Sequence, residues 1–483
     1  MPVDTQHPEY VASRKKWQRM RDSVAGDDAV QSAGQRYLPA LSGQSPEEYA
    51  AYLRRATFFG ATGRTSHALH GLIFRKAAVV EAPASLLPVF EDITMSGKSV
   101  SDLAQDIARE LIDVGRVGVL VDFPAVAEGQ TPSNAAQAGA LGLRPFASVY
   151  KAESVLNWAT TRIRNASQLA FLCLDESGLV QGTASDPYAY ELVERIRIVK
   201  LDADGLYVQE VHEKGAGGWA LVSTVAPMSS GKRLDSIPFV VATSAGLTAD
   251  VSDPPMLDLA DVNLSHFRTS ADLEHGAHFT GLPTPWVTGY TARTDANGNA
   301  VAEKFSIGSS SAWVFPGADV TVGYLEFSGD GLGSLERLMD RKEHQMSALG
   351  ARMLSGQKAG VESTGALEIR TNGETSVLAG IATTTSRAVT KICQLIADWA
   401  GVAGRVSVTV NTDFMPSSMS PQLAAQLFGM VQAGAISPQS FFWNMQAGEL
   451  IPEGKTFEEE QAQIDAATPA LPPLSAPAPA AAA

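Results

Sequence analysis

Two long helical patterns on either side of a short, turn-rich segment constrain the fold of this chain more than any other feature of its sequence. Within residues 254–281, apolar side chains at Ala260, Leu264, Phe267 and Ala271 follow spacings of 4, 3 and 4, which predicts one buried face of an α-helix. The segment that follows is rich in Pro, Gly and turn dipeptides, so it cannot continue that helix. The pattern therefore predicts a helix that leads into a β-hairpin excursion.

A second long helix is predicted where the chain returns from this excursion. Residues 282–331 contain Asn297-Gly298, a dipeptide that favours a hairpin turn, and residues 332–354 again have helical periodicity. One face of that second helix carries Leu335, Met339, Met346, Leu349 and Met353. At about 1.5 Å per residue, each helix would be about 30 Å long.

Residues 1–115 are expected to be helical. Ser45, Pro46 and Glu48 form a helix start, as N-cap, first helical residue and third residue of a capping box. Further helices are predicted at about 65–76 and 99–113.

Residues 116–253 contain consecutive strand patterns separated by turn residues, which predicts an antiparallel β-rich domain. An Asp-Gly signal at Asp202–Gly205 favours a hairpin. Residues 128–142 are predicted, from composition, to be a mobile insertion.

Helical patterns return after the second long helix. A Gly-rich break is followed by an apolar stripe from Val377 to Trp399, with Gly401 as a helix stop. A strand at 405–411 and three helices at about 420–433, 438–447 and 456–466 follow, and the tail 468–483 is Pro/Ala low complexity that we expect to be disordered. The chain as a whole is predicted to be of the α+β class.

Composition excludes several classes of protein. With 37 basic and 52 acidic residues the formal net charge is −15, which argues against coating of nucleic acid by the whole surface but not against a local channel. Cys173 and Cys393 are too few for a disulfide framework or zinc cluster and indicate buried thiols in a reducing compartment. No membrane span or signal peptide is predicted, so a soluble cytoplasmic product is expected.

Searches for catalytic motifs fail. Gly97-Lys98-Ser99 is similar to the end of a phosphate-binding loop, but Asp92 occupies the leading glycine position and would repel phosphates; a helix start before Val100 is the better interpretation. The Gly-rich turn at 329–333 lacks a βαβ context. His266, His275 and His278 share a helical face without a completing ligand, which favours surface or interface histidines over a metal site. We predict no enzymatic activity, cofactor or metal.

Three stretches resemble the portal proteins of tailed bacteriophages. Residues 37–76 (YLPALSGQSPEEYAAYLRRATFFGATGRTSHALHGLIFRK) are similar to the N-terminal signature of one portal subfamily. Residues 262–289 are similar to its first stem helix entering the clip, and residues 434–464 to its GxIS turn, helix and acidic helix. The order of predicted elements agrees with the same family.

The resemblance implies a portal architecture with a wing, a stem, a clip and a crown. Its segments would be 1–115 (helical part of the wing), 116–253 (β-rich part of the wing), 254–281 (first stem helix), 282–331 (clip), 332–354 (second stem helix), 355–365 (tunnel loop), 366–402 (kinked wing helix) and 403–467 (crown). No role is assigned to the tail 468–483.

By the same resemblance the chain would form a dodecameric homo-oligomeric ring at one capsid vertex of the virion, assembled in the host cytoplasm. Double-stranded DNA would pass without sequence specificity, and the clip would dock terminase and then a head–tail adaptor. Lys358 and Arg352 are candidates for phosphate contact in the tunnel, although Lys358 fits a solvated loop lysine equally well. Trp286 and Trp313 would pack the clip between subunits or within one subunit. A basic cluster in the wing, facing major capsid protein, scaffold protein or neighbouring subunits, would comprise Arg54, Arg55, Arg64, Arg75 and Lys76.

Two alternatives stay open at this point. One is another head–tail connector or minor capsid structural protein. The other is a nucleotide-driven motor subunit, which is disfavoured because Asp92 occupies the leading glycine position of the phosphate-binding loop. Under the portal hypothesis the acidic balance predicts tunnel-facing surfaces that are mainly acidic or neutral, because a strongly cationic lining would retain the phosphates.

Overall fold

The computed structural model divides the chain into two compact units, Met1–Thr412 and Asp413–Ala483, which are described separately. The residues that the structure describes are 3–124, 137, 141–163, 165–182, 186–229, 231–281, 284–289, 319–325, 331–353, 376–414, 421–433, 435–448, 450–451 and 455–467. Most of the predicted insertion 128–142, the Asn297-Gly298 turn, the Gly-rich segment 355–365 and the tail 468–483 lie outside them.

The larger unit begins with helices, as predicted. They are α1 (Pro8–Ala25), α2 (Asp27–Ser32), α3 (Pro46–Arg55), α4 (Ala61–Ile73), α5 (Leu87–Glu91) and α6 (Val100–Asp113), with the short strand β1 (Val79–Glu81) and the 3₁₀ turns η1 (Gly34–Arg36) and η2 (Ala84–Leu86) between them. The capping box at the start of α3 is confirmed: Ser45 Oγ accepts from the Glu48 N–H, and the Glu48 carboxylate accepts from the Ser45 N–H. The helix predicted at 65–76 begins earlier, at Ala61.

Antiparallel sheets follow, which confirms the predicted β-rich region. Their strands are β2 (Arg116–Asp122), β3 (Phe146–Lys151), β4 (Val155–Ile163), β5 (Ala166–Asp175), β6 (Gly178–Gln181), β7 (Tyr190–Val193), β8 (Arg195–Leu201), β9 (Tyr207–Gly215), β10 (Gly218–Val225), β11 (Met228–Ser229), β12 (Lys232–Arg233) and β13 (Phe239–Thr243), with η3 (Ala152–Ser154) after β3. One sheet has the order β10-β9-β8-β5-β4 and another has the order β13-β2-β3. The predicted turn between β8 and β9 is confirmed, with Leu201 opposite Tyr207 and Gly205 at φ +75°.

The core of the β-rich region also includes the first helix. Tyr10 and Trp17 of α1 belong to the same buried cluster as Leu172 and Leu174 of β5 and Tyr207 of β9. The N-terminal helix is therefore part of the β-sheet core.

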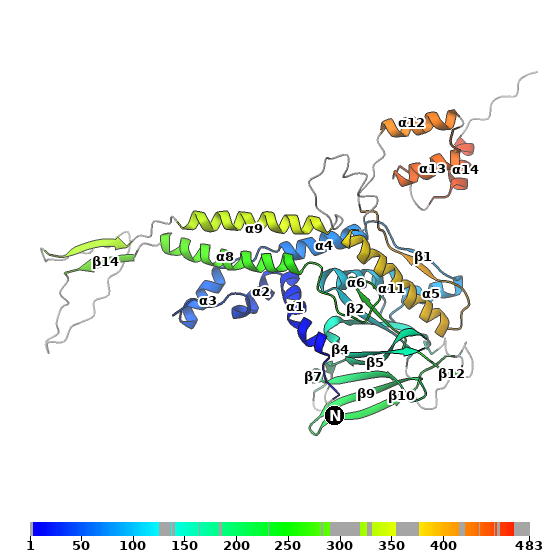
Figure 1. Ribbon diagram of the computed structural model, residues 1–483, viewed down its shortest axis with the longest axis horizontal. Helices are drawn as coiled ribbons and strands as arrows, with labels where there is room; N and C mark the ends of the chain where they lie inside the picture. Colours follow the sequence, from blue (N-terminus) through cyan, green and yellow to red (C-terminus); the bar gives the residue numbers. More distant parts are fainter. Residues whose placement is uncertain are drawn as a thin grey trace, which may run out of the picture. The chain divides into compact units, whose positions relative to one another are not determined.

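The two long helices are α8 (Leu257–Gly281) and α9 (Leu332–Arg352), which pack side by side (Figure 1). Between them in sequence lie β14 (Thr284–Thr288) and β15 (Thr321–Leu325), which pair antiparallel, with Trp286 opposite Gly323. The predicted apolar stripe of α8 is buried at all four of its positions. On α9, the five predicted stripe residues are buried or half-buried, and Met346 and Met353 are the most buried of them.

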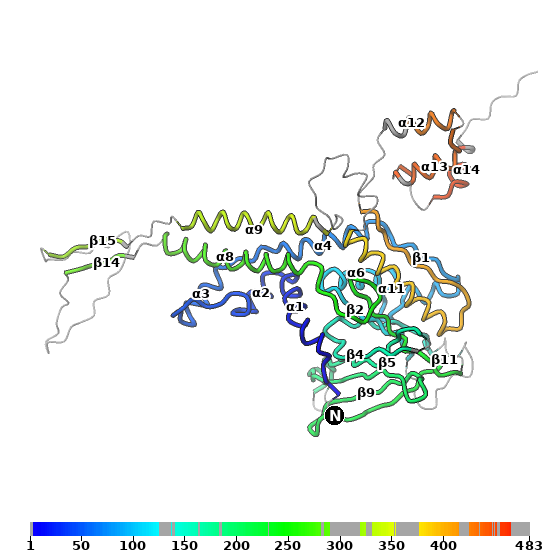
Figure 2. The backbone as a smooth tube through the Cα atoms, viewed as in Figure 1, coloured from blue at the N-terminus to red at the C-terminus, as the bar shows by residue number. Residues whose placement is uncertain are grey.

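Helix α11 (Val377–Trp399) packs against α6, β2, β13 and β16 (Ser407–Thr409) (Figure 2). It ends as predicted: Gly401 has φ +70°, its N–H bonds to the Asp398 carbonyl, and the Val402 N–H bonds to the Ala397 carbonyl. Together these bonds form a Schellman motif. Of the helix predicted at 366–402, residues 366–375 lie outside the described part of the chain.

The smaller unit contains α12 (Pro421–Gln432), α13 (Pro438–Ala447) and α14 (Phe457–Ala467), close to the predicted helices. Phe442 is buried and meets the Phe457 ring edge-on at 5.6 Å. Strand β16 instead pairs with β1 in the larger unit. The predicted segment 403–467 therefore contains residues of both units.

Candidate functional site

The α8–α9 hairpin is held together by a close contact at Gly276 and by the half-buried Lys342. A Cβ on Gly276 would lie 2.7 Å from Leu332 Cδ2, so the side chain at the start of α9 packs directly on the glycine of α8. Farther along, Lys342 of α9 donates to the Ser265 carbonyl at 2.9 Å and to the Thr269 hydroxyl. Burial, and secondarily the positive charge of Arg268, lower the pKa of Lys342. The ammonium binds α8 through neutral oxygens, which fixes the position of one helix along the other.

Helix α8 is also the element on which the N-terminal helices assemble. Asp272 accepts a 2.6 Å hydrogen bond from the Tyr52 hydroxyl of α3, and the fully buried Asn263 donates to Thr62 of α4 at 3.0 Å. Arg19 of α1 forms an ion pair with Asp261. Polar contacts along its length thus position α8 relative to three preceding helices.

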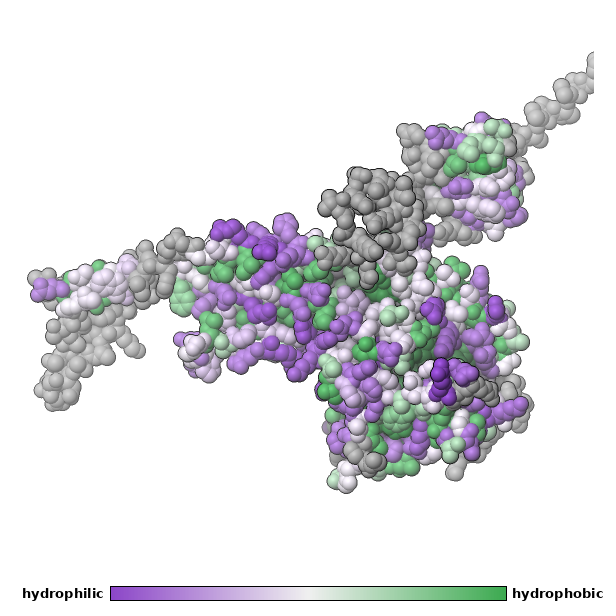
Figure 3. Space-filling view, in the orientation of Figure 1, coloured by the Kyte–Doolittle hydropathy of each residue, from purple (hydrophilic) through white to green (hydrophobic). Residues whose placement is uncertain are grey.

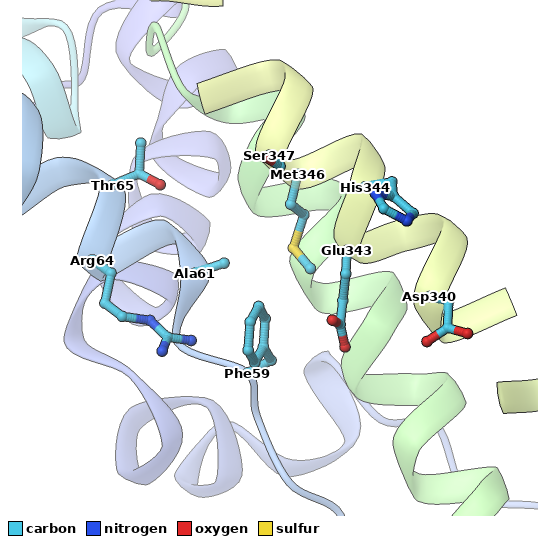
Figure 4. Close-up of a pocket in the computed structure, with 9 residues that line it drawn as sticks. All are labelled: Phe59, Ala61, Arg64, Thr65, Asp340, Glu343, His344, Met346 and Ser347. Atoms are coloured by element: carbon cyan, nitrogen blue, oxygen red, sulfur yellow. The ribbon is translucent and has the colours of Figure 1, made fainter. Parts of the chain in front are cut away.

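A cavity of about 500 Å³ lies between the start of α4 and the side of α9 (Figure 4). The Arg64 guanidinium lies over the Phe59 ring at 4.5 Å, and that ring lies 5.5 Å from His266. His266 Nε2 in turn lies 3.3 Å from a Glu343 oxygen. The cavity is lined by Phe59, Ala61, Arg64, Thr65, Asp340, Glu343, His344, Met346 and Ser347. Arg64, Phe59, His266 and Glu343 thus form a chain of contacts that joins α4, α8 and α9 beside the cavity.

Burial is the main cause that lowers the pKa of two histidines of α8. It lowers the pKa of His266, against the opposing effect of the hydrogen bond to Glu343. It also lowers the pKa of His275, with Arg55 as the next contributor. His266 is buried in the α8–α9 contact and is thus no surface histidine, whereas His278 lies 3.0 Å from the Arg55 guanidinium. Among the described residues, no group of His, Cys, Asp and Glu side chains is arranged to hold a metal ion.

The predicted wing basic cluster is spread along α8. Arg55 lies beside His278, while Arg64 lies near His266 through Phe59. These two histidines are about 18 Å apart along the helix axis. Arg54 is exposed at the end of α3, and Arg75 and Lys76 follow α4.

The other predicted site residues fall at the edges of the described chain. Trp286 is 40% exposed on β14, and a Cβ on Gly323 would lie 2.8 Å from its ring, so the indole covers the glycine of the paired strand. This contact lies within one chain. Arg352 is the last residue of α9. Lys358 and Trp313 lie outside the described residues.

Gly97-Lys98-Ser99 precedes a helix, which confirms the prediction of a helix start before Val100. Ser99 is the N-cap of α6, and it exchanges hydrogen bonds with Asp102 in a capping box. Lys98 forms an ion pair with Asp106 at 2.5 Å, and Asp92 accepts from the Gly97 N–H. These local bonds account for the motif.

Sequence reasoning missed Asn263 and Lys342, which join α8 to its neighbours. The available signal was a polar residue placed next to an apolar stripe: Asn263 precedes Leu264, and Lys342 lies on the same side of α9 as Met339 and Met346. Their partners, Thr62 and Ser265, could not be identified from spacing.

Comparison with known proteins gives two similarities. A family model described as a domain of unknown function, DUF4055, matches residues 255–400, which include α8, α9 and α11. A solved structure described as the neck of an empty GTA particle computed with C6 symmetry is similar over 89% of this chain and 100% of its own chain, at 11% identity and a TM-score of 0.38. A TM-score this low carries no argument about function. No curated protein matches the chain.

In the described part of the chain, none of the helices is both long enough and apolar enough to cross a membrane.

Proposed function

We propose that this chain is a structural protein of a phage particle and, specifically, a portal subunit that forms a ring-shaped channel for double-stranded DNA at one capsid vertex. The observation that carries the proposal is the helix, β-hairpin, helix succession of α8, β14–β15 and α9. This succession lies in the stretch whose sequence resembles a portal stem and clip. A pair of long helices held along α8 by α1, α3 and α4 suits a wall element built from helices packed side by side.

In this proposal the DNA contact is electrostatic and independent of sequence, because a moving duplex presents every sequence in turn. The net charge of −15 keeps the channel wall from retaining phosphates. Lys358 and Arg352 are proposed as sparse local contacts at the narrowest part of the channel.

The β14–β15 hairpin is proposed as the docking site for terminase and later for a head–tail adaptor. The helical and β-rich part of the larger unit would face capsid or scaffold protein. We propose no enzymatic role for the chain, since energy for translocation would come from the separate terminase.

Light scattering followed by electron microscopy of the purified full chain tests the proposal. We expect a closed ring with a central channel wide enough for a duplex. A chain that stays monomeric under all assembly conditions contradicts the proposal, and rings without an open channel favour another head–tail connector. Robust ATP hydrolysis by the purified chain would favour a motor subunit instead.

A further inference from the structure

A cationic pocket lies between α1, η1 and α8, apart from the cavity of Figure 4. It has a volume of about 790 Å³, and five cationic side chains line it: Arg14, Lys15, Arg19, Arg36 and Arg268. In a chain with a net charge of −15, such a concentration of positive charge marks this surface as distinct.

Three of these cations have no acidic partner within the described part of the chain. Arg19 is neutralised by Asp261, and Arg36 lies 3.3 Å from Asp22. Arg14, Lys15 and Arg268 are exposed and form no ion pair there. The pocket therefore carries a positive charge that its own walls do not balance, and it suits a ligand with several carboxylates or phosphates.

One stripe of helix α9 carries negative charge, although Arg337, Arg341 and Lys342 lie beside it on the same helix. Glu336, Asp340 and Glu343 recur at spacings of 4 and 3, which places them on one stripe of the helix. All three are exposed, and Asp340 and Glu343 border the cavity of Figure 4. Hydrophilic residues are prominent on the visible surface of the α8–α9 hairpin (Figure 3).

The cationic pocket and the acidic stripe lie on opposite sides of α8. Leu264 and Arg268 line the pocket, whereas His266 contacts Glu343 of the acidic stripe. Each residue of an α-helix is rotated by about 100° from the one before. His266 is two residues from both Leu264 and Arg268, so it points about 160° away from them.

We propose that the acidic stripe of α9 in one copy of this chain docks into the cationic pocket of the next copy. Two different, complementary surfaces on opposite sides of one element give a head-to-tail contact, which closes into a ring when the rotation between copies allows it. The inference rests on the proposed function for the ring and assigns the side chains that join its subunits. A DNA phosphate backbone is the alternative anionic occupant of the pocket, and the experiment below distinguishes it from a second copy of the chain.

Charge reversal on each side tests the docking in the full chain. One variant carries Arg14→Glu and Lys15→Glu, and the other carries Glu336→Lys and Asp340→Lys. Each should weaken self-association by at least about tenfold, because like charges then meet across the contact. An equimolar mixture of the two variants should restore rings, since every surface again meets its complement. A chain with all four reversals should also assemble.

Arg387→Glu on α11 and Glu91→Lys on α5 are matched controls, since both residues are exposed away from the two surfaces. The readouts are light scattering and electron microscopy, with circular dichroism to show that each variant is folded. Rings from both double variants would overturn the docking while leaving the proposed function intact. A monomeric wild-type chain would contradict both. If the Arg14→Glu, Lys15→Glu variant forms normal rings but loses DNA affinity, the pocket binds phosphates and the docking is wrong.

Discussion

At the scale of single residues, the least expected group is the buried Arg116 of β2. It is 1% exposed, and none of its three guanidinium nitrogens has a hydrogen-bond partner in the described part of the chain. Burial lowers its pKa to about 10, while Glu9 and Asp250 act in the opposite direction. The guanidinium lies 3.8 Å from the centre of the Trp158 ring, so a cation–π contact replaces the missing hydrogen bonds.

We predict that Arg116→Met leaves stability unchanged or increases it, because methionine fills similar space without a charge to desolvate. Trp158→Ala should instead lower the free energy of unfolding by about 3–5 kcal/mol, since it removes a buried aromatic ring. Urea unfolding measures both. A loss of several kcal/mol in Arg116→Met would mean that the charge itself stabilises the fold.

At the scale of elements, α4 shows how a small residue sets the distance between helices. A Cβ on Gly63 would lie 2.6 Å from the Val24 carbonyl oxygen at the end of α1. Backbone cannot move aside as a flexible side chain can, so only glycine fits there. Gly71, in the same helix, has open space around it.

Two alanine substitutions in α4 should therefore have opposite signs. Gly71→Ala should stabilise the protein by up to about 1 kcal/mol through helix propensity. Gly63→Ala should destabilise it by about 1–3 kcal/mol, because overpacking against α1 outweighs the same gain in propensity. Thermal unfolding of the two variants beside wild type measures the difference. Equal shifts of the same sign would show that α1 and α4 do not pack this closely.

Helix starts, helix ends and buried helix faces could be predicted where they depend on residues close together in the sequence. The capping box at Ser45, the α8 stripe and the stop at Gly401 depend on neighbours within a few residues, and all three are confirmed. The helix α1 was not identified, because its apolar residues Tyr10 and Trp17 meet distant β-strands. No spacing in the sequence reveals such partners.

Less of the candidate site could be predicted from the sequence, because tertiary packing brings its residues together. Sequence grouped the arginines of residues 54–76 as one basic cluster, but their positions along α8 depend on tertiary packing. The cationic pocket unites α1 with Arg268, which is more than two hundred residues away in sequence. Proximity in sequence therefore groups charged residues that the fold places at different positions along α8.

At the scale of the whole molecule, buried histidines connect folding to pH. Burial is the first cause that lowers the pKa of His70 on α4 and of His266 on α8. An unfolded histidine titrates near about 6.5. At these two positions the unfolded chain binds more protons than the folded chain as the pH falls through that value, so their contribution to stability is lost until the lower folded pKa values are reached.

We predict that His266→Gln makes the unfolding temperature less sensitive to acidification between about pH 7.5 and 5.5 than that of wild type. Burial also raises the pKa values of Glu110 and Asp113. Both carboxyl groups are present in the variant and in wild type, so the difference between the two pH profiles reports on the change at His266. His67→Gln, at an exposed position of α4, is the control. An identical pH profile for His266→Gln and wild type would contradict the prediction.

The pairing of β1 with β16 has a consequence for the synthesis of the protein. Val79 pairs with Thr409, and Asn411 donates to the Leu72 carbonyl across 339 residues of chain. At roughly 5–20 residues per second, the ribosome supplies the second partner about 20–70 s after the first. During that interval β1 is an unpaired strand edge, and α8 and α9 are synthesised in its later part. Completion of the larger unit is therefore a late event, and a nascent chain must avoid contact with other copies until its last strand has arrived.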